Sequence, residues 1–188
     1  MLKNKSFYGI VGTAIILITL VIYTLTPPAT TNSGVAKTPL DWQTHVSQSM
    51  GFGLAYPQTM DVREYEDGSV TFVLLGPTQS KNTEILDGVS INFSSNAFKG
   101  DFKEFVDKDW QLKKEEEEIY QEVGTIKEVT YANTQGYSYT VRSLGDFDLI
   151  FLPTDDNSYL QITLLVEDPK NQGFREISYK ILETLAIK

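Results

Sequence analysis

Cysteine is absent from the 188 residues of this chain, and its absence excludes several kinds of site. A chain without thiols forms no disulfide bonds, holds no Fe–S cluster, ligates no zinc through sulfur and has no cysteine nucleophile. It also lacks the cysteine that carries the lipid of a bacterial lipoprotein. Proteins without cysteine function in oxidising and in reducing compartments, so this absence does not locate the protein.

Basic residues are also scarce, because 16 Lys and Arg stand against 25 Asp and Glu, which gives a formal net charge of −9. Nucleic-acid binding depends on Lys and Arg to neutralise phosphates, so we expect no nucleic-acid partner. The same deficit argues against peripheral binding to anionic lipid headgroups. The composition is otherwise that of a globular protein, with 41% hydrophobic and 22% charged residues.

Histidine occurs once, as His45, and no catalytic motif accompanies it. The chain has no G-x-S-x-G nucleophile turn, and Gly51-Phe52-Gly53 lacks the third glycine and the helix start of a phosphate-binding loop. We therefore interpret His45 as an edge-strand residue and expect neither catalytic residues nor a cofactor. A hydrolase that uses a pair of carboxylates stays open as an alternative function, since no pattern singles out or excludes such a pair.

A long uncharged segment lies near the N-terminus, where residues 7–25 read FYGIVGTAIILITLVIYTL. In a helix that rises 1.5 Å per residue, this length spans about 28 Å, which matches the hydrocarbon core of a bilayer. Lys3 and Lys5 precede the segment and predict a cytoplasmic N-terminus by the positive-inside rule. We expect residues 1–6 in the cytoplasm, a single-pass transmembrane helix in the cell membrane, and an extracytoplasmic C-terminal domain.

A cleaved signal peptide is the alternative to this anchor. The apolar part of a signal peptide is usually about 7–15 residues long and ends at an Ala-x-Ala-like site. The apolar run in this chain is longer, and the sequence TPPA that follows it crowds such a site with proline. We therefore predict an uncleaved anchor, followed by a flexible tether over the small, polar, proline-rich residues 26–39.

Residues 40–188 have the patterns of a single domain with eight strands and two helices. The predicted strands are 42–46, 52–56, 70–75, 89–93, 125–131, 137–143, 147–152 and 159–166. The first two strands form a hairpin around a turn of serine and glycine. The connections between the last four strands are short, including a turn at 133–136, and short connections predict antiparallel neighbours.

Two segments change to a helical period. In the first, over 101–114, apolar residues recur at i, i+3, i+4 and i+8 from Phe102 to Trp110, and Asp101 is the expected N-cap. The second, over 172–185, carries an apolar stripe that must be buried, most simply on one face of the sheet. The predicted fold class is therefore α+β, with a central antiparallel β-sheet flanked by helices.

Two acidic turns are better candidates for a metal site than the glutamate run at 115–118. Asp146 and Asp148 lie at one predicted turn, and Asp155 and Asp156 lie at the next. Carboxylate oxygens ligate Ca²⁺ and Mn²⁺, so a cation-binding assembly module is an alternative function. Aspartate also occurs in hairpin turns for purely conformational reasons. Four consecutive glutamates at 115–118 point in different directions on a helix and predict no site.

The order of these elements and several of their residues resemble the PsbP-like domains of the Mog1/PsbP type, found in bacterial membrane-anchored proteins. The motifs that carry the resemblance are Trp42-x-Thr44-His45, Gly51-Phe52-x-Leu54-x-Tyr56-Pro57 and Ile181-Leu182-Glu183-Thr184-Leu185. The resemblance covers nearly all of residues 42–188. It departs from the usual pattern at His45, where tyrosine is common, and at Met60, where many such domains have tryptophan.

The resemblance implies a central antiparallel sheet flanked by helices, and a binding or accessory role more than catalysis. The tyrosines at Tyr131, Tyr137 and Tyr139 suit cross-strand pairs in a core or an exposed recognition surface. We therefore expect a membrane-anchored, extracytoplasmic, non-catalytic domain. Its expected partners are the lipid bilayer, through the N-terminal helix, and a protein or another component of the cell envelope.

Overall fold

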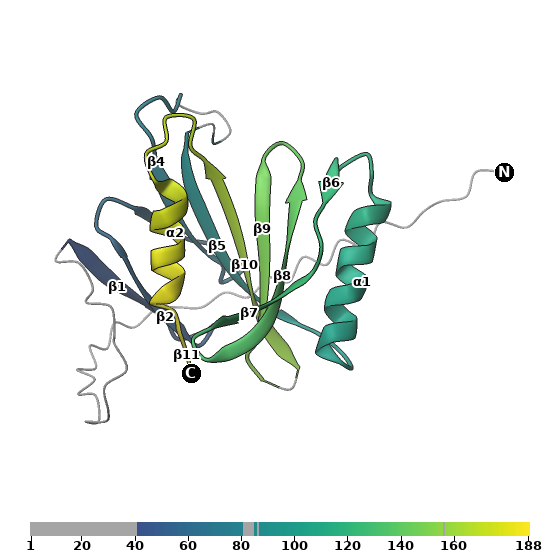
Figure 1. The fold of residues 1–188 in the computed structure, drawn as a ribbon. Coiled ribbons are helices and arrows are strands. Elements are labelled where there is room, and N and C mark those ends of the chain that lie inside the picture. Colours follow the sequence, from purple (N-terminus) through teal and green to yellow (C-terminus); the bar gives the residue numbers. More distant parts are fainter. Residues whose placement is uncertain (1–40, 81–84, 86, 156) are drawn as a thin grey trace.

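The structure, a computed structural model, describes residues 41–80, 85, 87–155 and 157–188. The predicted membrane helix at 7–25 and the tether at 26–39 lie outside these residues, so both stay predictions. Within the described part of the chain, no helix has the length and apolar character needed to cross a bilayer. The described residues form two β-sheets and two helices (Figure 1).

The larger sheet has eight strands in the order β3-β4-β5-β10-β9-β8-β6, with β7 also paired to β8. All of its pairs are antiparallel. The pairs among β7, β8, β9 and β10 confirm the prediction from their short connections. Its strands are β3 (Asp61–Glu64), β4 (Val70–Leu75), β5 (Gly88–Ala97), β6 (Glu122–Val123), β7 (Lys127–Tyr131), β8 (Thr134–Arg142), β9 (Asp146–Pro153) and β10 (Ser158–Glu167). The sequence did not predict β3 and β6, because strands of four and two residues are too short to show an alternation.

The turn between β7 and β8 is tighter than the sequence predicts. The expected turn covers residues 133–136, but β8 already begins at Thr134. Ala132 and Asn133 have φ angles of 52° and 61°, as in a two-residue type I′ turn. The predicted turn was too long, because the two-residue turn ends at Asn133 and Gly136 already pairs with Val129 of β7.

The smaller sheet has three strands in the order β1-β2-β11, namely β1 (Trp42–Ser47), β2 (Phe52–Pro57) and β11 (Ala186–Ile187). The antiparallel β1–β2 hairpin confirms the prediction. Strand β11 was not predicted, because the apolar pattern extends the last helix to residue 185. Helix α2 (Phe174–Glu183) instead ends before Thr184, whose Oγ1 accepts a hydrogen bond from the N–H of Ala55 at 2.8 Å. This contact directs the C-terminal residues along β2.

The main hydrophobic core lies between the two sheets and beneath α2. The ring of Phe52 on β2 stacks on Phe93 of β5 with the centroids 4.6 Å apart, and Phe72 meets Phe93 edge-on at 5.7 Å. Helix α2 adds the fully buried side chains of Ile181 and Leu182 to the same core. Burying one such side chain contributes about 1.5–3 kcal/mol. The stripe of α2 is therefore buried on the sheet, as its spacing predicts.

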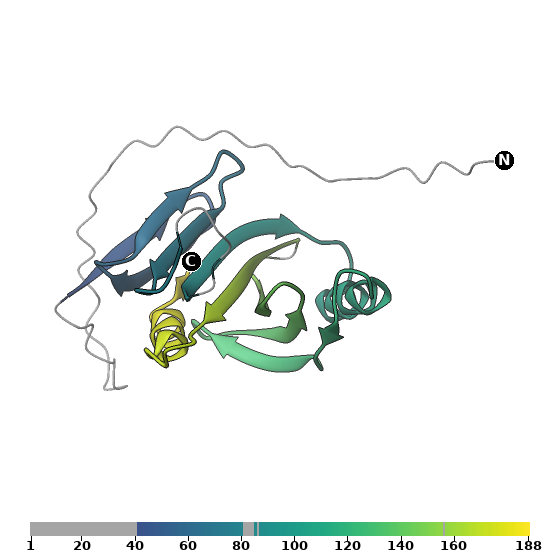
Figure 2. The same ribbon diagram turned by 90° about the horizontal axis from the view of Figure 1, so that it is seen from above.

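Helix α1 (Phe102–Glu115) covers the opposite face of the large sheet. Side chains alternate between the two faces of a strand. In β9, Ile150 and Leu152 belong to the main core, whereas Leu149 and Phe151 belong to a second core beneath α1. The two helices consequently stand well apart on the domain, as Figure 2 shows.

Two polar contacts hold α1 in place. Asp101 caps the helix as predicted, because its carboxylate accepts a hydrogen bond from the N–H of Glu104 at 2.9 Å. Further along α1, Asp109 accepts a hydrogen bond from the hydroxyl of Tyr139, a β8 side chain that is only 2% exposed. Burial, together with the Asp109 carboxylate, raises the pKa of Tyr139 well above its ordinary value. This hydroxyl therefore keeps its proton at physiological pH.

Two carboxylates organise the start of α2. Asp168 accepts hydrogen bonds from the N–H groups of Gly173 and Phe174, at 2.8 and 3.1 Å, and so satisfies backbone donors at the N-terminus of the helix. Asp87, directly before β5, is 1% exposed. It accepts hydrogen bonds from the hydroxyl of Thr78 at 2.6 Å and from the side-chain amide of Gln172 at 2.8 Å. Asp87 thus ties the loop after β4 to the loop that precedes α2.

Candidate functional site

The first two predicted metal ligands already interact with cationic side chains. Nε of Arg142 donates to Oδ1 of Asp146 at 2.6 Å, and this contact lowers the pKa of Asp146. Oδ2 of Asp148 accepts a hydrogen bond from Arg175 of α2 at 3.2 Å and lies 3.4 Å from the hydroxyl of Tyr179. Both carboxylates thus act as hydrogen-bond acceptors within the fold.

Asp155 lies beyond the other end of β9 and does not approach them. Its Oδ1 accepts a hydrogen bond from the N–H of Asn157 at 2.9 Å, which is turn geometry. At about 3.3 Å per residue, the chain from Asp148 to Asp155 spans about 23 Å. β9 therefore separates Asp155 from Asp146 and Asp148, and Asp156 lies outside the described residues. Across the described ranges, no three or more His, Asp or Glu side chains converge in a way that suits a metal ion.

His45 lies on β1 at the edge of the small sheet, as predicted. Its ring meets Phe72 edge-on with the centroids 5.4 Å apart, and the ring of Phe52 is 6.0 Å away. Burial lowers the pKa of this imidazole, and the opposing effect of the Glu64 carboxylate is smaller. Among the described residues, the buried Nε2 of His45 has no hydrogen-bond partner. We therefore interpret His45 as a neutral packing residue.

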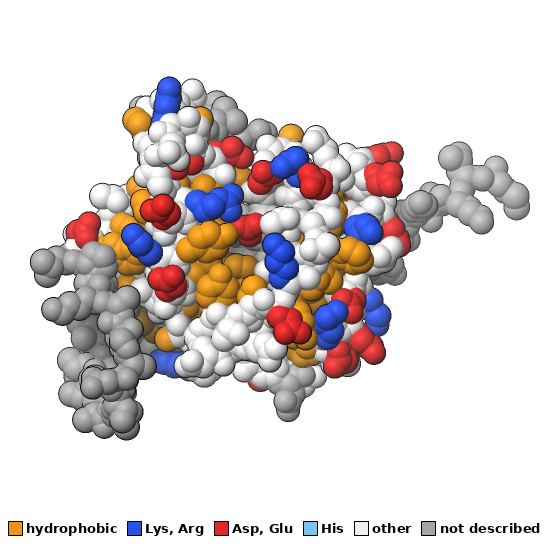
Figure 3. Space-filling model, viewed as in Figure 1, with side chains coloured by type: hydrophobic (Ala, Val, Ile, Leu, Met, Phe, Trp, Pro, Cys, Tyr) orange, Lys and Arg blue, Asp and Glu red, His pale blue; other side chains and the backbone are white. Residues whose placement is uncertain are grey.

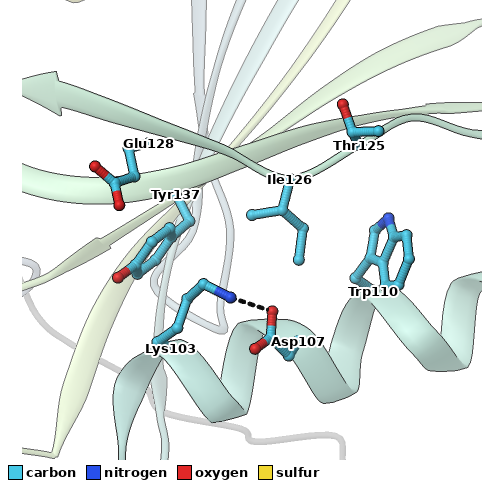
Figure 4. A pocket seen from close by; sticks show the side chains of 7 residues that line it. All are labelled: Lys103, Asp107, Trp110, Thr125, Ile126, Glu128 and Tyr137. Carbon is cyan, nitrogen blue, oxygen red and sulfur yellow. Dashed lines mark hydrogen bonds and ion pairs between the residues drawn. The ribbon is translucent and has the colours of Figure 1, made fainter.

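The candidate functional site is a groove between α1 and the segment that leads into β7, with a volume of about 380 Å³. In Figure 4, side chains from α1 form one wall, side chains from residues 125–128 form the other, and a tyrosine of β8 lies between them. The lining residues are Lys103, Asp107 and Trp110 from α1, Thr125, Ile126 and Glu128 from the second wall, and Tyr137 from β8. We call this the α1 groove.

Helical spacing places three of these side chains on one face of α1. Lys103, Asp107 and Trp110 stand at i, i+4 and i+7, which are neighbouring positions on a helix surface. Trp110 packs against the second core, as its place in the apolar stripe predicts, and it is half-buried and also lines the groove. The groove itself was not predicted. The pattern that could have indicated it is the polar face beside the apolar stripe, where Lys103 and Asp107 form an i, i+4 pair of opposite charges and Trp110 follows three residues later.

Trp110 also fixes the opposite wall of the groove. Its indole N–H donates a hydrogen bond to the carbonyl oxygen of Gly124 at 2.7 Å, and the N–H of Gly124 donates to the carbonyl oxygen of Thr140 on β8 at 2.8 Å. A Cβ atom at Gly124 would collide with the hydroxyl of Thr140, so this close approach favours glycine. The segment before β7 is thereby held both to the sheet and to α1.

Two lysines of α1 lie over the aromatic rings of the groove. Nζ of Lys103 is 5.5 Å from the ring centroid of Tyr137, and Nζ of Lys114 is 4.4 Å from that of Trp110. Lys103 also pairs with Asp107, and this hydrogen bond raises the pKa of Lys103. The side chains of the pair are 44% and 47% exposed, so solvent screens their attraction. A ligand of similar charge can therefore compete for Asp107.

Glu128 contributes a second carboxylate from the opposite wall (Figure 4). Its Oε2 accepts a hydrogen bond from the side-chain amide of Gln135 at 3.3 Å. In the part of the chain that the structure describes, no Lys or Arg forms an ion pair with Glu128. The groove thus combines two aromatic rings, one paired and one unpaired carboxylate, and one lysine. These groups are suited to recognition by stacking, cation–π contact and hydrogen bonding.

A second hollow, of about 490 Å³, lies between the β7–β8 turn and the end of α2. It is lined by residues 129–133 and by Leu182 and Glu183, and Figure 3 shows hydrophobic side chains gathered over the nearby surface between α2 and β9. Burial and the neighbouring Tyr179 raise the pKa of Tyr131 there. Glu183 is the one charged residue of this lining, so the hollow says less about the chemistry of a ligand than the α1 groove does.

The domain has a PsbP-like fold, which confirms the prediction made from its motifs. It is similar to the solution structure of cyanobacterial PsbP (CyanoP) from Synechocystis sp. PCC 6803, with a TM-score of 0.54 and 10% sequence identity over 86% of this chain and 100% of that chain. A crystal structure from Bacteroides thetaiotaomicron VPI-5482 is similar with a TM-score of 0.47 and 13% identity, over 79% of this chain and 49% of that chain. No protein-family model and no curated protein sequence matches the chain.

Proposed function

We propose that this chain is a single-pass membrane protein whose PsbP-like domain lies outside the cytoplasmic membrane and binds a protein partner as an accessory domain. The observation that carries the binding role is the α1 groove, which is lined by Trp110, Tyr137 and Glu128. Glu128 has no cationic partner among the residues that the structure describes. The resemblance to PsbP-like domains supports an accessory role over a catalytic one. The uncharged segment at 7–25, with Lys3 and Lys5 before it, supports the membrane location.

The alternative of a cation-binding module has less support than the sequence suggested. Asp146 and Asp148 each interact with an arginine, and Asp155 is separated from them by the length of β9. A free metal ion would have to displace these arginines to bind. The α1 groove holds two carboxylates on opposite walls, which is too few for a calcium site of six to eight oxygens without many waters.

The membrane location is tested by extraction and protease accessibility. Full-length chain in intact cells should resist carbonate extraction, and protease added from outside should digest the domain. A domain that is protected in intact cells and digested only after lysis would place it in the cytoplasm and refute this part of the proposal. Release by carbonate would show a cleaved signal peptide instead of an anchor.

The binding role is tested by photo-crosslinking in living cells. A photoreactive phenylalanine replaces Thr125, which is exposed at the groove, or Glu66, which is exposed in the β3–β4 turn and serves as the matched control. We expect a discrete crosslinked product from position 125 that is absent from position 66 and is weakened by Trp110→Leu. The same products from both positions, or products that are insensitive to Trp110→Leu, would contradict the role of the groove.

A further inference from the structure

We propose that the α1 groove recognises an arginine side chain of its partner, and this inference rests on the binding role proposed above. The first observation is that the chain already places cations on both aromatic rings. Lys103 lies over Tyr137 and Lys114 over Trp110, at 5.5 and 4.4 Å from the ring centroids. Aromatic faces attract cations through the ring quadrupole. The ring faces in this groove are therefore arranged for positively charged groups.

The second observation is the charge balance of the groove. Lys103 neutralises Asp107, whereas Glu128 on the opposite wall has the Gln135 amide as its neighbour and no cationic partner among the described residues. The lining therefore carries one net negative charge. The whole chain carries a formal net charge of −9, which favours approach of a basic partner. A cationic ligand complements both the local and the overall charge.

The groups that line the groove favour arginine over lysine as this ligand. A guanidinium is planar and has five donors, so one group can stack on an aromatic ring while it donates hydrogen bonds to a carboxylate. Asp107 and Glu128 provide acceptors on the two walls, and Trp110 and Tyr137 provide the rings (Figure 4). An ammonium group is a compact point charge that is strongly hydrated and has no plane to stack on a ring. Weak hydration of the guanidinium further lowers the cost of its transfer into the groove.

Lys103 acts in this arrangement as a competitor that belongs to the chain itself. It occupies Asp107 and one face of Tyr137, which are two of the groups that an incoming arginine would use. Removing its charge should therefore strengthen arginine binding, although the groove loses one polar contact of its own. A purely structural role for Lys103 predicts no such gain. This opposite response to two charge-removing substitutions, at Lys103 and at Glu128, is the signature of the proposal.

The test titrates the full-length chain in detergent with N-acetyl-arginine methylamide and follows the fluorescence of Trp110 in a Trp42→Phe background. The neutral isostere N-acetyl-citrulline methylamide is the control ligand. We expect saturable binding of the arginine probe and none of the citrulline probe. Glu128→Gln should weaken binding about threefold and Lys103→Gln should tighten it about twofold, the range of one exposed ion pair. The charge-matched controls Glu176→Gln on α2 and Lys108→Gln on α1 should leave the affinity unchanged.

Equal responses to both probes, or weakening by Lys103→Gln, would overturn the proposal. Loss of affinity with Glu176→Gln as large as that with Glu128→Gln would show binding by overall charge and would also overturn it. These failures are distinguishable from failure of the proposed function. Groove-specific crosslinking from position 125 without arginine binding would leave a partner-binding groove of different specificity, whereas loss of that crosslink removes the binding role itself.

Discussion

Replacing Tyr139 with phenylalanine should destabilise the domain at neutral pH by about 1.5 kcal/mol. The substitution removes one buried hydroxyl and its hydrogen bond to Asp109 while it keeps the ring. A hydrogen bond to a charged group contributes about 1.5–3 kcal/mol. The lower end of that range applies, because Asp109 is only partly buried and water replaces its lost donor.

The effect should also depend on pH in a defined direction. Burial and the Asp109 carboxylate raise the pKa of Tyr139 far above 10.0, the ordinary value for tyrosine. Above about pH 10 the unfolded chain loses this proton and the folded chain retains it, so the wild type loses about 1.4 kcal/mol of stability per pH unit through this residue. The contribution is therefore complete below pH 10 and falls as the pH rises. At pH 11 the stability gap between the wild type and Tyr139→Phe should have nearly closed.

Urea unfolding of the full-length chain in detergent, followed by near-ultraviolet circular dichroism at pH 7, 9 and 11, measures this gap. Tyr159, whose pKa burial raises to about 12, is present in both proteins and cancels in the comparison. Tyr65→Phe is the matched control, because Tyr65 is 49% exposed and should show no gap at any pH. A gap for Tyr139→Phe that stays constant from pH 7 to 11 would refute the reasoning, since it would mean that the folded hydroxyl ionises as readily as the unfolded one.

Three further predictions concern buried residues. His45→Phe should leave stability at pH 7.5 unchanged or higher, because it removes a buried nitrogen without a partner among the described residues. It should also abolish the loss of stability that a lowered histidine pKa causes below about pH 6.5. A lower urea midpoint at pH 7.5 would contradict this prediction. Asp87→Asn should lower the urea midpoint at pH 7. The difference from the wild type should close below about pH 4, because the Thr78 hydrogen bond lowers the pKa of Asp87 despite its burial. Equal midpoints at pH 7 would show that Asp87 does not stabilise the contact between the loop after β4 and the loop before α2. Gly136→Ala should cost about 1–3 kcal/mol of unfolding free energy, because a Cβ there collides with the backbone oxygen of Phe151, and an unchanged thermal midpoint would be inconsistent with this packing.

Local patterns in the sequence predicted most of the fold. The strands that are longer than four residues were each predicted, because five or more residues are enough to show β-prone character or an alternation of apolar side chains. The antiparallel pairing of the last four strands followed from the shortness of their connections. The cap of α1 at Asp101 followed from the residue type and its position before the apolar stripe.

The features that were missed depend on contacts between distant segments. Strand β11 exists because Thr184 contacts Ala55, which lies 129 residues earlier in the chain. The α1 groove exists because Trp110 meets Gly124 across a connection that carries no sequence pattern. The separation of Asp148 from Asp155 also follows from the fold, because the two residues are close in sequence but lie at opposite ends of the extended strand β9.

The sequence by itself determined the two helices, the strands longer than four residues, the antiparallel pairing of the last four of those strands, the anionic character of the chain and the prediction of a membrane anchor. These properties follow from residue type and short-range spacing, which act within a few residues along the chain. Only the tertiary structure decided which face each helix covers, which carboxylates find cationic partners and which stay unpaired. The meeting of Lys103, Asp107 and Trp110 of α1 with Glu128 and with Tyr137 of β8 around one groove arises from packing. Spacing along the chain does not specify which distant segments meet. The candidate site is formed by such a meeting, so only the tertiary structure could reveal it.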